Sequence, residues 1–317
     1  MTQSSASRPS VSAAFFLVGP TASGKSAVAQ HLAERDGLEI LSADSMLIYR
    51  GMDIGTAKPG RAEQARVRHY GMDLAEPGET FSVGRYLEEA SGAFRDGRCP
   101  IVCGGTGLYI KCLTEGLATR PPPDPQRRAA LEARYQEHGV PGLRGELERI
   151  APGRLARLAD PNNPRRLIRA IELALSGAPD ARTWPGASAS PLVGLRRAPE
   201  DLRARIQARA RALFAGGLLE EVAALRKSSP GFSQTARHAI GYAEADAVLE
   251  KRCSIEEAVA RTAQRTWQLS RRQMTWFRHQ ARVEWVETAP GTPLEILAEH
   301  VQAIWRTHGP TPVILPT

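Results

Sequence analysis

Gly19-Pro20-Thr21-Ala22-Ser23-Gly24-Lys25-Ser26 fits the pattern G-x-x-x-x-G-K-[ST], and an apolar run over residues 13–18 precedes it. Small and apolar residues then recur at helical spacing over residues 27–33, so the octapeptide joins a buried strand to a helix. In such a loop the backbone N–H groups converge on phosphate oxygens, Lys25 adds a positive charge, and the Ser26 hydroxyl can bind Mg²⁺. We predict that residues 19–26, here called the phosphate loop, bind a phosphate compound, with Ser26 as the magnesium ligand. The pattern alone does not say which compound that is.

The rest of the chain predicts a parallel sheet around this loop. Residues 38–44, 100–103 and 192–195 are short apolar runs with the length of buried strands. Helical spacing separates them over residues 81–95, and an arginine-rich helix is expected over 199–215. Strands that alternate with helices are typical of a parallel sheet with crossover helices, so the predicted class is an α/β fold with a P-loop core.

Three polar residues directly follow predicted strands: Ser26, Asp44 and Thr106. Ligands of parallel sheets bind at the carboxyl ends of the strands, so we expect these side chains to lie together. Asp44 suits a catalytic or metal-linked carboxylate, and a helix N-cap is the alternative. Thr106 lies in a glycine turn, residues 104–107, which allows close approach to a ligand but also fits a plain strand-to-helix connection.

Composition and charge limit the partners. The chain has 317 residues and a net charge of +8, and most of its basic residues are arginine. This favours an anionic partner, although many mildly basic proteins have no nucleic-acid role. Four cysteines without paired metal-ligand spacing indicate reduced thiols in a cytoplasmic protein. No run approaches eighteen apolar residues, so no membrane span is expected.

Proline-rich stretches divide the predicted fold. The run at residues 120–125 cannot continue a helix or a central strand, and it marks a boundary. The following residues are helical in pattern and rich in arginine, up to a loose stretch at 177–191. The expected organisation is a disordered tail at 1–11, a P-loop core at 12–122 and 191–290, a helical insertion domain at 123–190, and a C-terminal tail at 291–317.

Arginines of the predicted insertion favour a nucleic-acid contact when taken together. Arg165, Arg166 and Arg169 share one helix, and Arg127 and Arg128 follow the proline run. For any one of them a solvated helix face is the better interpretation. As a group beside a phosphate site they indicate a nucleic-acid clamp.

These residues resemble the bacterial tRNA dimethylallyltransferases, in the family's order, from about residue 13 to 285. The matching motifs are Gly19 to Ser26, Ser42-Ala43-Asp44-Ser45, Tyr49-Arg50-Gly51-Met52-Asp53-Ile54-Gly55-Thr56-Ala57-Lys58-Pro59, Gly104-Gly105-Thr106-Gly107-Leu108-Tyr109, Pro161-Asn162-Asn163-Pro164-Arg165-Arg166-Leu167, Ile240-Gly241-Tyr242 and Gln268-Leu269-Ser270-Arg271-Arg272-Gln273-Met274-Thr275-Trp276-Phe277-Arg278. The long motif that ends at Pro59 is far more specific than the phosphate loop.

The resemblance implies transfer of a dimethylallyl group from dimethylallyl diphosphate to N6 of the adenosine 3′ to the anticodon, with Mg²⁺ as cofactor. The phosphate loop would hold the diphosphate, and the tRNA anticodon stem-loop would be the macromolecular partner of a monomeric enzyme. The catalytic candidates are Asp44, Thr106 and Lys25. Candidates for contact with tRNA are Asp44, Ser45, Met46, Leu47, Thr106, Arg128, Arg165, Arg166, Leu167, Ile168 and Arg169.

Some positions depart from the family's usual pattern. Asn163 stands where an acid is common, and Ala159 replaces a histidine. Tyr70 and Gly71, which follow His69, also differ from the usual residues, as do Trp267 and Ser270. These departures weaken the predictions for the insertion more than the catalytic assignment.

Three other functions share parts of this pattern. A small-molecule kinase uses the same loop and an acid after the second strand, and an adenine-nucleotide prenyltransferase is closer still. An ATP-driven nucleic-acid-binding protein requires a second acid after an apolar run, and the sequence offers no convincing pair of this kind. The arginine-rich insertion favours the tRNA enzyme over the kinase.

Overall fold

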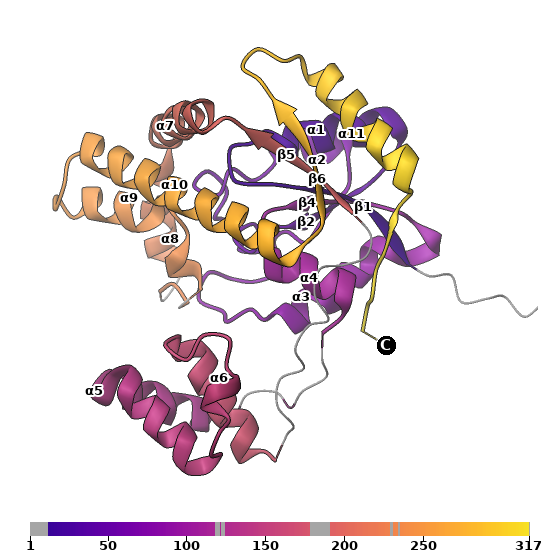
Figure 1. The fold of residues 1–317 in the computed structure, drawn as a ribbon. Coiled ribbons are helices and arrows are strands. Elements are labelled where there is room, and N and C mark those ends of the chain that lie inside the picture. The colour runs from indigo at the N-terminus through magenta and orange to yellow at the C-terminus, as the bar shows by residue number, and fades with distance from the viewer. Residues whose placement is uncertain are drawn as a thin grey trace, which may run out of the picture. The chain divides into compact units, whose positions relative to one another are not determined.

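The computed structural model describes residues 12–117, 121, 124–177, 191–228, 231–233 and 235–316. These residues form two compact units, one within residues 1–117 and 186–317 and the other within 118–185. We call them the core unit and the helical unit (Figure 1). The predicted tail at 1–11 lies outside the described residues, as do the predicted domain limits at 122, 123 and 190.

The core unit is built on one seven-stranded sheet with helices on its faces. The strands are β1 (Ala13–Val18), β2 (Ile40–Ala43), β3 (His69–Tyr70), β4 (Ile101–Gly104), β5 (Leu192–Arg197), β6 (Val283–Thr288) and β7 (Thr311–Pro312). The helices are α1 (Lys25–Asp36), α2 (Arg61–Arg66), α3 (Val83–Ala90), α4 (Gly107–Glu115), α7 (Pro199–Ala215), α8 (Leu218–Ser228), α9 (Tyr242–Leu249), α10 (Ile255–Gln280) and α11 (Leu294–His308).

The sheet is parallel in the order β3-β2-β4-β1-β5-β6, which confirms the predicted α/β class. β1 lies between β4 and β5, with Leu17 opposite Cys103 on one side and Val193 on the other. The two strands that neighbour β1 come much later in the chain. The carboxyl ends of β1, β2, β4 and β5 therefore meet at one edge, directly beside the phosphate loop.

The predicted elements differ from the structure mainly at their ends. The helix expected over residues 81–95 begins at Val83 and ends at Ala90, and the chain continues as a 3₁₀ segment. Asp96, with a left-handed φ of 59°, breaks the helical path near the end of that segment. The long helix α10 begins with a capping box. Ser254 Oγ accepts from the Glu257 amide, and Glu257 accepts from the Ser254 amide.

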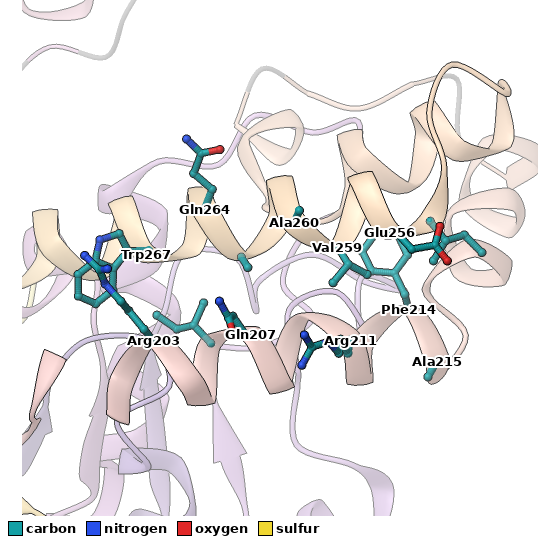
Figure 2. Close-up of a pocket in the computed structure, with 13 residues that line it drawn as sticks. Arg203, Gln207, Arg211, Phe214, Ala215, Glu256, Val259, Ala260, Gln264 and Trp267 are labelled. Atoms are coloured by element: carbon teal, nitrogen blue, oxygen red, sulfur yellow. The ribbon is translucent and has the colours of Figure 1, made fainter. Parts of the chain in front are cut away.

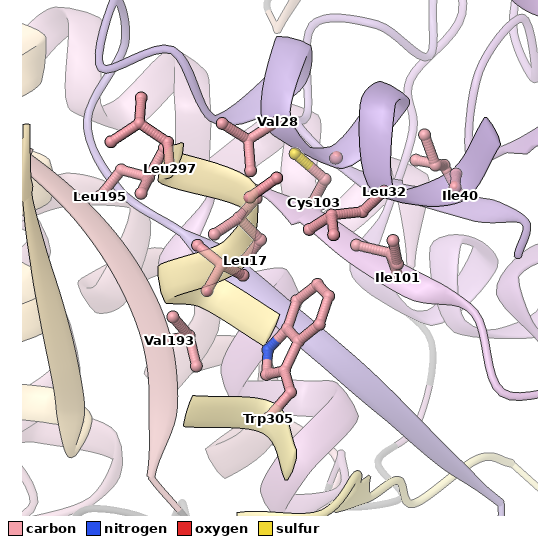
Figure 3. Packing of buried hydrophobic residues seen from close by; sticks show 14 of the residues in the cluster. Leu17, Val28, Leu32, Ile40, Ile101, Cys103, Val193, Leu195, Leu297 and Trp305 are labelled. Carbon is pink, nitrogen blue, oxygen red and sulfur yellow. The ribbon is translucent and has the colours of Figure 1, made fainter. Parts of the chain in front are cut away.

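Residues 291–317 are expected as a tail, but the described part of this stretch contains a helix that packs in the core unit. α11 packs against α1 and the sheet, and its residues Leu297, Val301 and Trp305 are buried in one cluster with Leu17 and Leu32 (Figure 3). Trp305 Nε1 also donates to the Phe16 carbonyl at 3.2 Å. The apolar residues of α11 share one face, and burying that face against the sheet accounts for the helix.

β7 adds the only antiparallel pairing seen among the described strands. Ala13 lies opposite Pro312 and Ala14 opposite Thr311, at the start of β1 where β5 has not yet begun to pair. The short strand thus satisfies backbone groups that the rest of the sheet leaves open.

The helical unit consists mainly of α5 (Pro125–Ile150) and α6 (Pro164–Leu175), which pack through a small apolar core. Asp124 and Asn163 cap the two helices. α5 bends at Gly139, whose φ of 62° interrupts the helix just before Pro141. In the described part of the chain, no helix has both the length and the apolar character needed to cross a membrane.

Candidate active site

The phosphate loop turns sharply out of β1 between two glycines with left-handed φ angles. Gly19 has φ 146°, and a Cβ there would lie 2.7 Å from the Leu195 carbonyl oxygen of β5. Gly24 has φ 100° and occupies the N-cap of α1. The loop can therefore follow this path only with glycine at both positions, and the path directs the N-terminus of α1 toward the edge of the sheet.

Lys25 is the charged centre of the loop and is 8% exposed. Its Nζ donates to the Pro20 carbonyl at 3.2 Å, which holds the ammonium group under the loop. Burial lowers the pKa of Lys25 below its ordinary value of 10.5, and the nearby Asp44 carboxylate opposes this effect. Ser23 Oγ is also buried, with no hydrogen-bond partner among the described residues. A bound anion would relieve the desolvation of Lys25.

Three arginines, one at the end of β5 and two on α7, contact the same region. Arg197 Nε donates to the Ser23 carbonyl at 2.9 Å, and Arg205 Nε donates to the Ala22 carbonyl at 3.0 Å. Arg209 Nη2 donates to the Thr56 carbonyl at 3.1 Å. Sequence reasoning expected the arginine-rich helix but did not assign it to the site. The assignment could have been made from the order of the elements. α7 directly follows β5, and the carboxyl end of β5 lies at the same edge of the sheet as the phosphate loop.

These groups surround a cavity of about 490 Å³, here called the phosphate cavity. Its lining includes Lys25, Ser26, Asp44, Cys103, Arg205 and Arg209. Burial raises the pKa of Cys103 to about 11, so its thiol stays neutral at physiological pH. Three cationic side chains against one carboxylate give the cavity a net positive charge, which suits a diphosphate.

The phosphate cavity also fits the expected Mg²⁺. Ser26 Oγ and the Asp44 carboxylate are hard oxygen donors that line the same space as the cationic groups. Mg²⁺ prefers oxygen ligands and commonly takes one or two from protein, with phosphate oxygens and water completing an octahedron. The donor set present here matches that preference.

Asp44 does not cap a helix, because residues 45–48 form turns. Its Oδ1 accepts from the Met46 amide at 3.0 Å, which fixes the carboxylate in a short local turn. The adjacent Ser45 amide donates to Thr106 Oγ1 at 3.0 Å. As expected, Ser26, Asp44 and Thr106 come together at the carboxyl edge of the sheet.

A second cavity, of about 610 Å³, is also lined by Asp44. We call it the acceptor cavity. Its lining differs in character, with hydroxyl, amide, guanidinium and indole groups from Thr106, Gln268, Arg272 and Trp276. It shares Thr21, Asp44, Thr56 and Arg209 with the phosphate cavity. Asp44 therefore borders both spaces.

Gln273 of α10 connects the phosphate loop to the glycine turn. Its Oε1 accepts from the Thr21 amide at 2.9 Å, and its Nε2 donates to the Gly105 carbonyl at 3.1 Å. A Cβ on Gly105 would lie 2.3 Å from Gln273 Nε2, and one on Gly107 would lie 2.2 Å from the Trp276 indole. The turn can approach α10 this closely only because it lacks side chains there. Of two adjacent aromatic residues of α10, Phe277 is buried, whereas Trp276 lines the acceptor cavity.

A third cavity, of about 850 Å³, lies between α7 and α10 and shares no residue with the other two. Its apolar lining includes Phe214 and Val259 (Figure 2), together with Ile206. At one end the Arg203 guanidinium lies over the Trp267 ring, 4.4 Å from its centroid. Trp267 thus packs with an arginine of α7, at the rim of a groove rather than in the core.

Comparison of the sequence with models of known protein families assigns the chain to a family. A family model described as IPP transferase matches residues 47–280, and another, described as Isopentenyl transferase, matches residues 12–73. The chain belongs to the IPP transferase family.

Its relatives in that family are similar over nearly their whole length. A tRNA dimethylallyltransferase from Anaeromyxobacter dehalogenans is 42% identical over 296 residues, covering 90% of this chain and 98% of that protein. A solved tRNA isopentenylpyrophosphate transferase from Bacillus halodurans is 32% identical with a TM-score of 0.66, covering 92% of this chain and 95% of that one. A Staphylococcus epidermidis tRNA delta(2)-isopentenylpyrophosphate transferase is 30% identical with a TM-score of 0.64, and covers 93% of this chain and 99% of that one.

Two of the predicted RNA contacts in the helical unit of this IPP transferase, Leu167 and Ile168, are 0% and 6% exposed. Both belong to the apolar core of the unit, so their side chains serve its packing. Both lie on the face of α6 that packs against the core of the unit. Their position next to charged residues in the sequence does not indicate this burial. Arg165 and Arg166, by contrast, are exposed.

Arg128 and Arg169 share one buried partner in the helical unit. Arg128 binds both carboxylate oxygens of Glu172, at 2.8 and 2.9 Å, and Arg169 donates to Glu172 Oε2 at 3.0 Å. The Glu172 side chain is 4% exposed, and sequence reasoning did not single it out. The Arg128–Glu172 pair therefore links α5 to α6, while Arg169 contacts Glu172 within α6.

Asn163 retains the structural role expected of an acid at its position. Its Oδ1 accepts from the Arg165 and Arg166 amides at 3.1 and 3.3 Å at the start of α6. Asparagine and aspartate cap helices about equally well, so this departure from the family pattern leaves the helix start intact.

Proposed function

We propose that the chain transfers a dimethylallyl group from dimethylallyl diphosphate to N6 of the adenosine 3′ to the anticodon of tRNA. The observation that carries the proposal is that Asp44 borders both a cationic phosphate cavity and a polar, aromatic acceptor cavity. A donor diphosphate in the first and a nucleobase in the second would meet at this carboxylate.

On the donor side, the bond between the allylic carbon and the diphosphate oxygen breaks. The leaving group then carries additional negative charge, which Lys25, Arg205, Arg209 and the loop amides are placed to stabilise. Mg²⁺ held by Ser26 would supply further charge neutralisation on the diphosphate when bound. Because the cationic groups are fixed by contacts with loop carbonyls, little reorganisation is required as the charge develops.

On the acceptor side, the exocyclic amine forms the new nitrogen–carbon bond and loses a proton. An adenine amine is a weak nucleophile, so a fixed carboxylate that accepts this proton assists the transfer, and Asp44 is the candidate. Thr106 lies beside it and fixes the Ser45 backbone. The base must leave the anticodon-loop stack to enter the cavity, where Trp276 offers a ring for stacking.

The exposed Arg165 and Arg166 of the helical unit are candidates for phosphate contacts with the tRNA. We propose that the enzyme acts as a monomer. We place its activity in the cytoplasm, where unmodified tRNA is available.

The test combines the wild-type protein and the Asp44→Asn variant with Mg²⁺, dimethylallyl diphosphate and unmodified tRNA. Nucleosides are then analysed by mass spectrometry. We expect prenylated adenosine with the wild type and a loss of turnover of about 10²-fold or more with Asp44→Asn, at nearly unchanged tRNA affinity. ATP turnover without prenylated adenosine would reject the proposal in favour of a kinase. A variant with near-full rate would show that Asp44 only shapes its turn.

A further inference from the structure

The segment between β2 and α2 forms a roof over the active site without helix or strand structure of its own over residues 53–57. Thr56 lines both cavities, and Ala57 lines the phosphate cavity. Ala57 has a left-handed φ of 51°, which is unfavourable for a residue with a Cβ. Contacts from elsewhere must therefore hold this roof segment, residues 53–57, in place.

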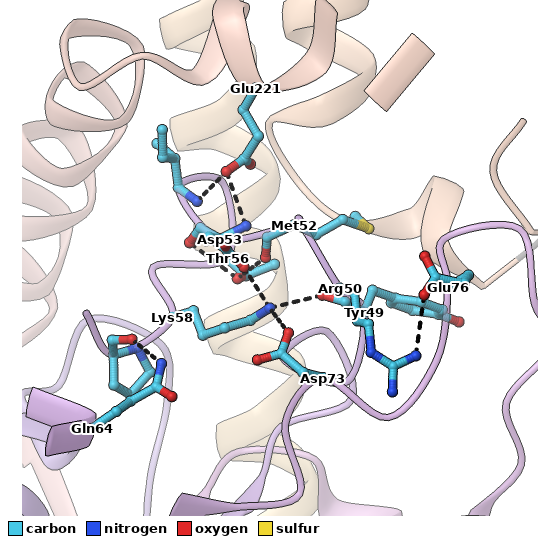
Figure 4. A network of polar contacts seen from close by, with 12 residues as sticks. Tyr49, Arg50, Met52, Asp53, Thr56, Lys58, Gln64, Asp73, Glu76 and Glu221 are labelled. Atoms are coloured by element: carbon cyan, nitrogen blue, oxygen red, sulfur yellow. Dashed lines mark hydrogen bonds and ion pairs between the residues drawn. The ribbon is translucent and has the colours of Figure 1, made fainter. Parts of the chain in front are cut away.

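One carboxylate of α8 supplies the principal contacts (Figure 4). Glu221 Oε2 accepts from the Asp53 amide at 3.0 Å and from the Ile54 amide at 2.6 Å, and Oε1 accepts from the Gly55 amide at 3.3 Å. Three consecutive N–H groups thus converge on one anion, an arrangement in which charge-assisted hydrogen bonds fix the backbone.

Tyr242 of α9 contacts both Glu221 and the roof segment. Its hydroxyl donates to Glu221 Oε1 at 2.6 Å, and its ring lies so close to Gly55 that a Cβ there would be 2.4 Å from it. Burial and the Glu221 carboxylate both raise the pKa of Tyr242, so the hydroxyl remains a donor. The carboxylate is thereby held at the position that the three amides require.

Lys58 anchors the far end of the roof segment. Its Nζ donates to the Tyr49 carbonyl at 2.8 Å and contacts Asp53 and Asp73 at 2.5 and 2.6 Å (Figure 4). The Lys58 side chain is only 3% exposed. Residues 53–57 are thus fixed from both ends.

One hydrogen bond connects the roof segment to an arginine of the active site. The Thr56 carbonyl accepts from Arg209 Nη2 at 3.1 Å, while Thr56 Oγ1 donates to the Met52 carbonyl at 2.6 Å. Arg209 lines both cavities. A displaced Thr56 carbonyl would leave the guanidinium without the partner that orients it.

We propose that Glu221 is a positioning residue for the transfer reaction, which acts through the roof segment to orient Arg209 toward the donor diphosphate. Glu221 lines neither cavity and reaches the substrate only through this relay. The inference rests on the proposed function in one respect, namely that the anion in the phosphate cavity is a diphosphate.

The test is Glu221→Gln, with Glu220→Gln as the matched control. The glutamine keeps the shape but replaces one acceptor oxygen with a donor that faces an N–H group. We expect the KM for dimethylallyl diphosphate to rise about tenfold, with the KM for tRNA changed less than about twofold. Glu220 is exposed on the same helix, and its variant should keep both constants.

A double-mutant cycle separates positioning from a general loss of stability. If Glu221 acts through Arg209, Glu221→Gln should add little to the donor KM of an Arg209→Lys variant. If the two substitutions instead raise the donor KM independently, so that their fold-changes multiply, Glu221 does not act through Arg209 and the proposal is overturned. If Glu221→Gln fails to fold, Tyr242→Phe removes only the hydroxyl donor, and it should raise the donor KM about twofold to fivefold. An unchanged donor KM in the folded variants would reject the proposal.

Calorimetry with inorganic diphosphate keeps this test separate from that of the function. Glu221→Gln should weaken diphosphate binding by the same factor as the donor KM. If the wild-type protein binds diphosphate but makes no prenylated adenosine, the proposed function is rejected. The role of Glu221 is then decided by comparing the diphosphate affinities of the wild type and the Glu221→Gln variant. Equal diphosphate affinity in wild type and variant would reject the positioning role alone.

Discussion

At the scale of single residues, the site depends on one cation that is partly stripped of water. Lys25 is almost fully buried and touches a carbonyl oxygen instead of a carboxylate. Burial lowers its pKa, because the charged form loses hydration that the neutral form does not need. A bound diphosphate would restore a favourable environment for the charge. Binding and protonation of this lysine are therefore coupled.

This coupling predicts a pH dependence of diphosphate affinity. Only protonated Lys25 attracts the anion, so affinity should be full below the lowered pKa of the free protein and should fall as pH rises through it, before the ordinary value of 10.5 is reached. Calorimetry between pH 7 and 10, in buffers of different ionisation enthalpy, should show proton uptake on binding. The Lys25→Arg variant, which stays charged, should lose this alkaline decline, and its persistence would assign the effect to another group.

At the scale of elements, local patterns and distant contacts differ in what the sequence reveals. The phosphate loop was predictable because strand, glycines, Lys25 and Ser26 all lie within a few residues, and the parallel class followed from alternating strands and helices. The contacts of Arg205 and Arg209 join groups 183 and 153 residues apart, and no local pattern encodes such a pairing. Glu221 was missed for the same reason, since it meets its amides about 167 residues away.

The end of the chain shows a second limit. The amphipathic pattern of α11 was visible, but its burial partner was not, because the sheet face that it covers is assembled from several strands and α1. An isolated amphipathic pattern does not tell a packed helix from a surface one.

Burial of α11 predicts a clear difference between two neighbouring positions. Leu297→Ala should lower the free energy of unfolding by about 2–5 kcal/mol, because it leaves a cavity against the sheet. Ile296→Ala should change it much less, since Ile296 is 41% exposed on the same helix. Urea unfolding followed by circular dichroism measures both. Equal losses would mean that α11 does not pack as the structure has it.

At the scale of the whole molecule, the chemistry and the arginine-rich surface belong to different units. The core unit holds both cavities, and the helical unit has its own apolar core around Leu143 and Leu167. Its buried Glu172 ties Arg128 and Arg169 together. Substitutions can therefore affect the use of the prenyl donor and the use of tRNA separately.

Glu172→Gln should affect tRNA use without affecting donor use. Loss of the charge weakens the contacts with both arginines, so we expect the helical unit to lose about 1–3 kcal/mol of stability and the KM for tRNA to rise, while the KM for dimethylallyl diphosphate stays constant. Glu137→Gln, at an exposed site of the same unit, is the control. An increase in the donor KM would contradict the separation of roles.

The pairing of β7 with β1 has a consequence for biosynthesis. Ala13 and Ala14 lie opposite Pro312 and Thr311, and the Val313 amide donates to the Ser12 carbonyl at 2.7 Å. The strand that leads into the phosphate loop is synthesised before all the other strands of this sheet, and its partner β7 is made after all of them. The helical unit needs only nearby residues and can form while synthesis continues, whereas closure of the sheet waits for contacts of very high sequence separation and should be the slow step.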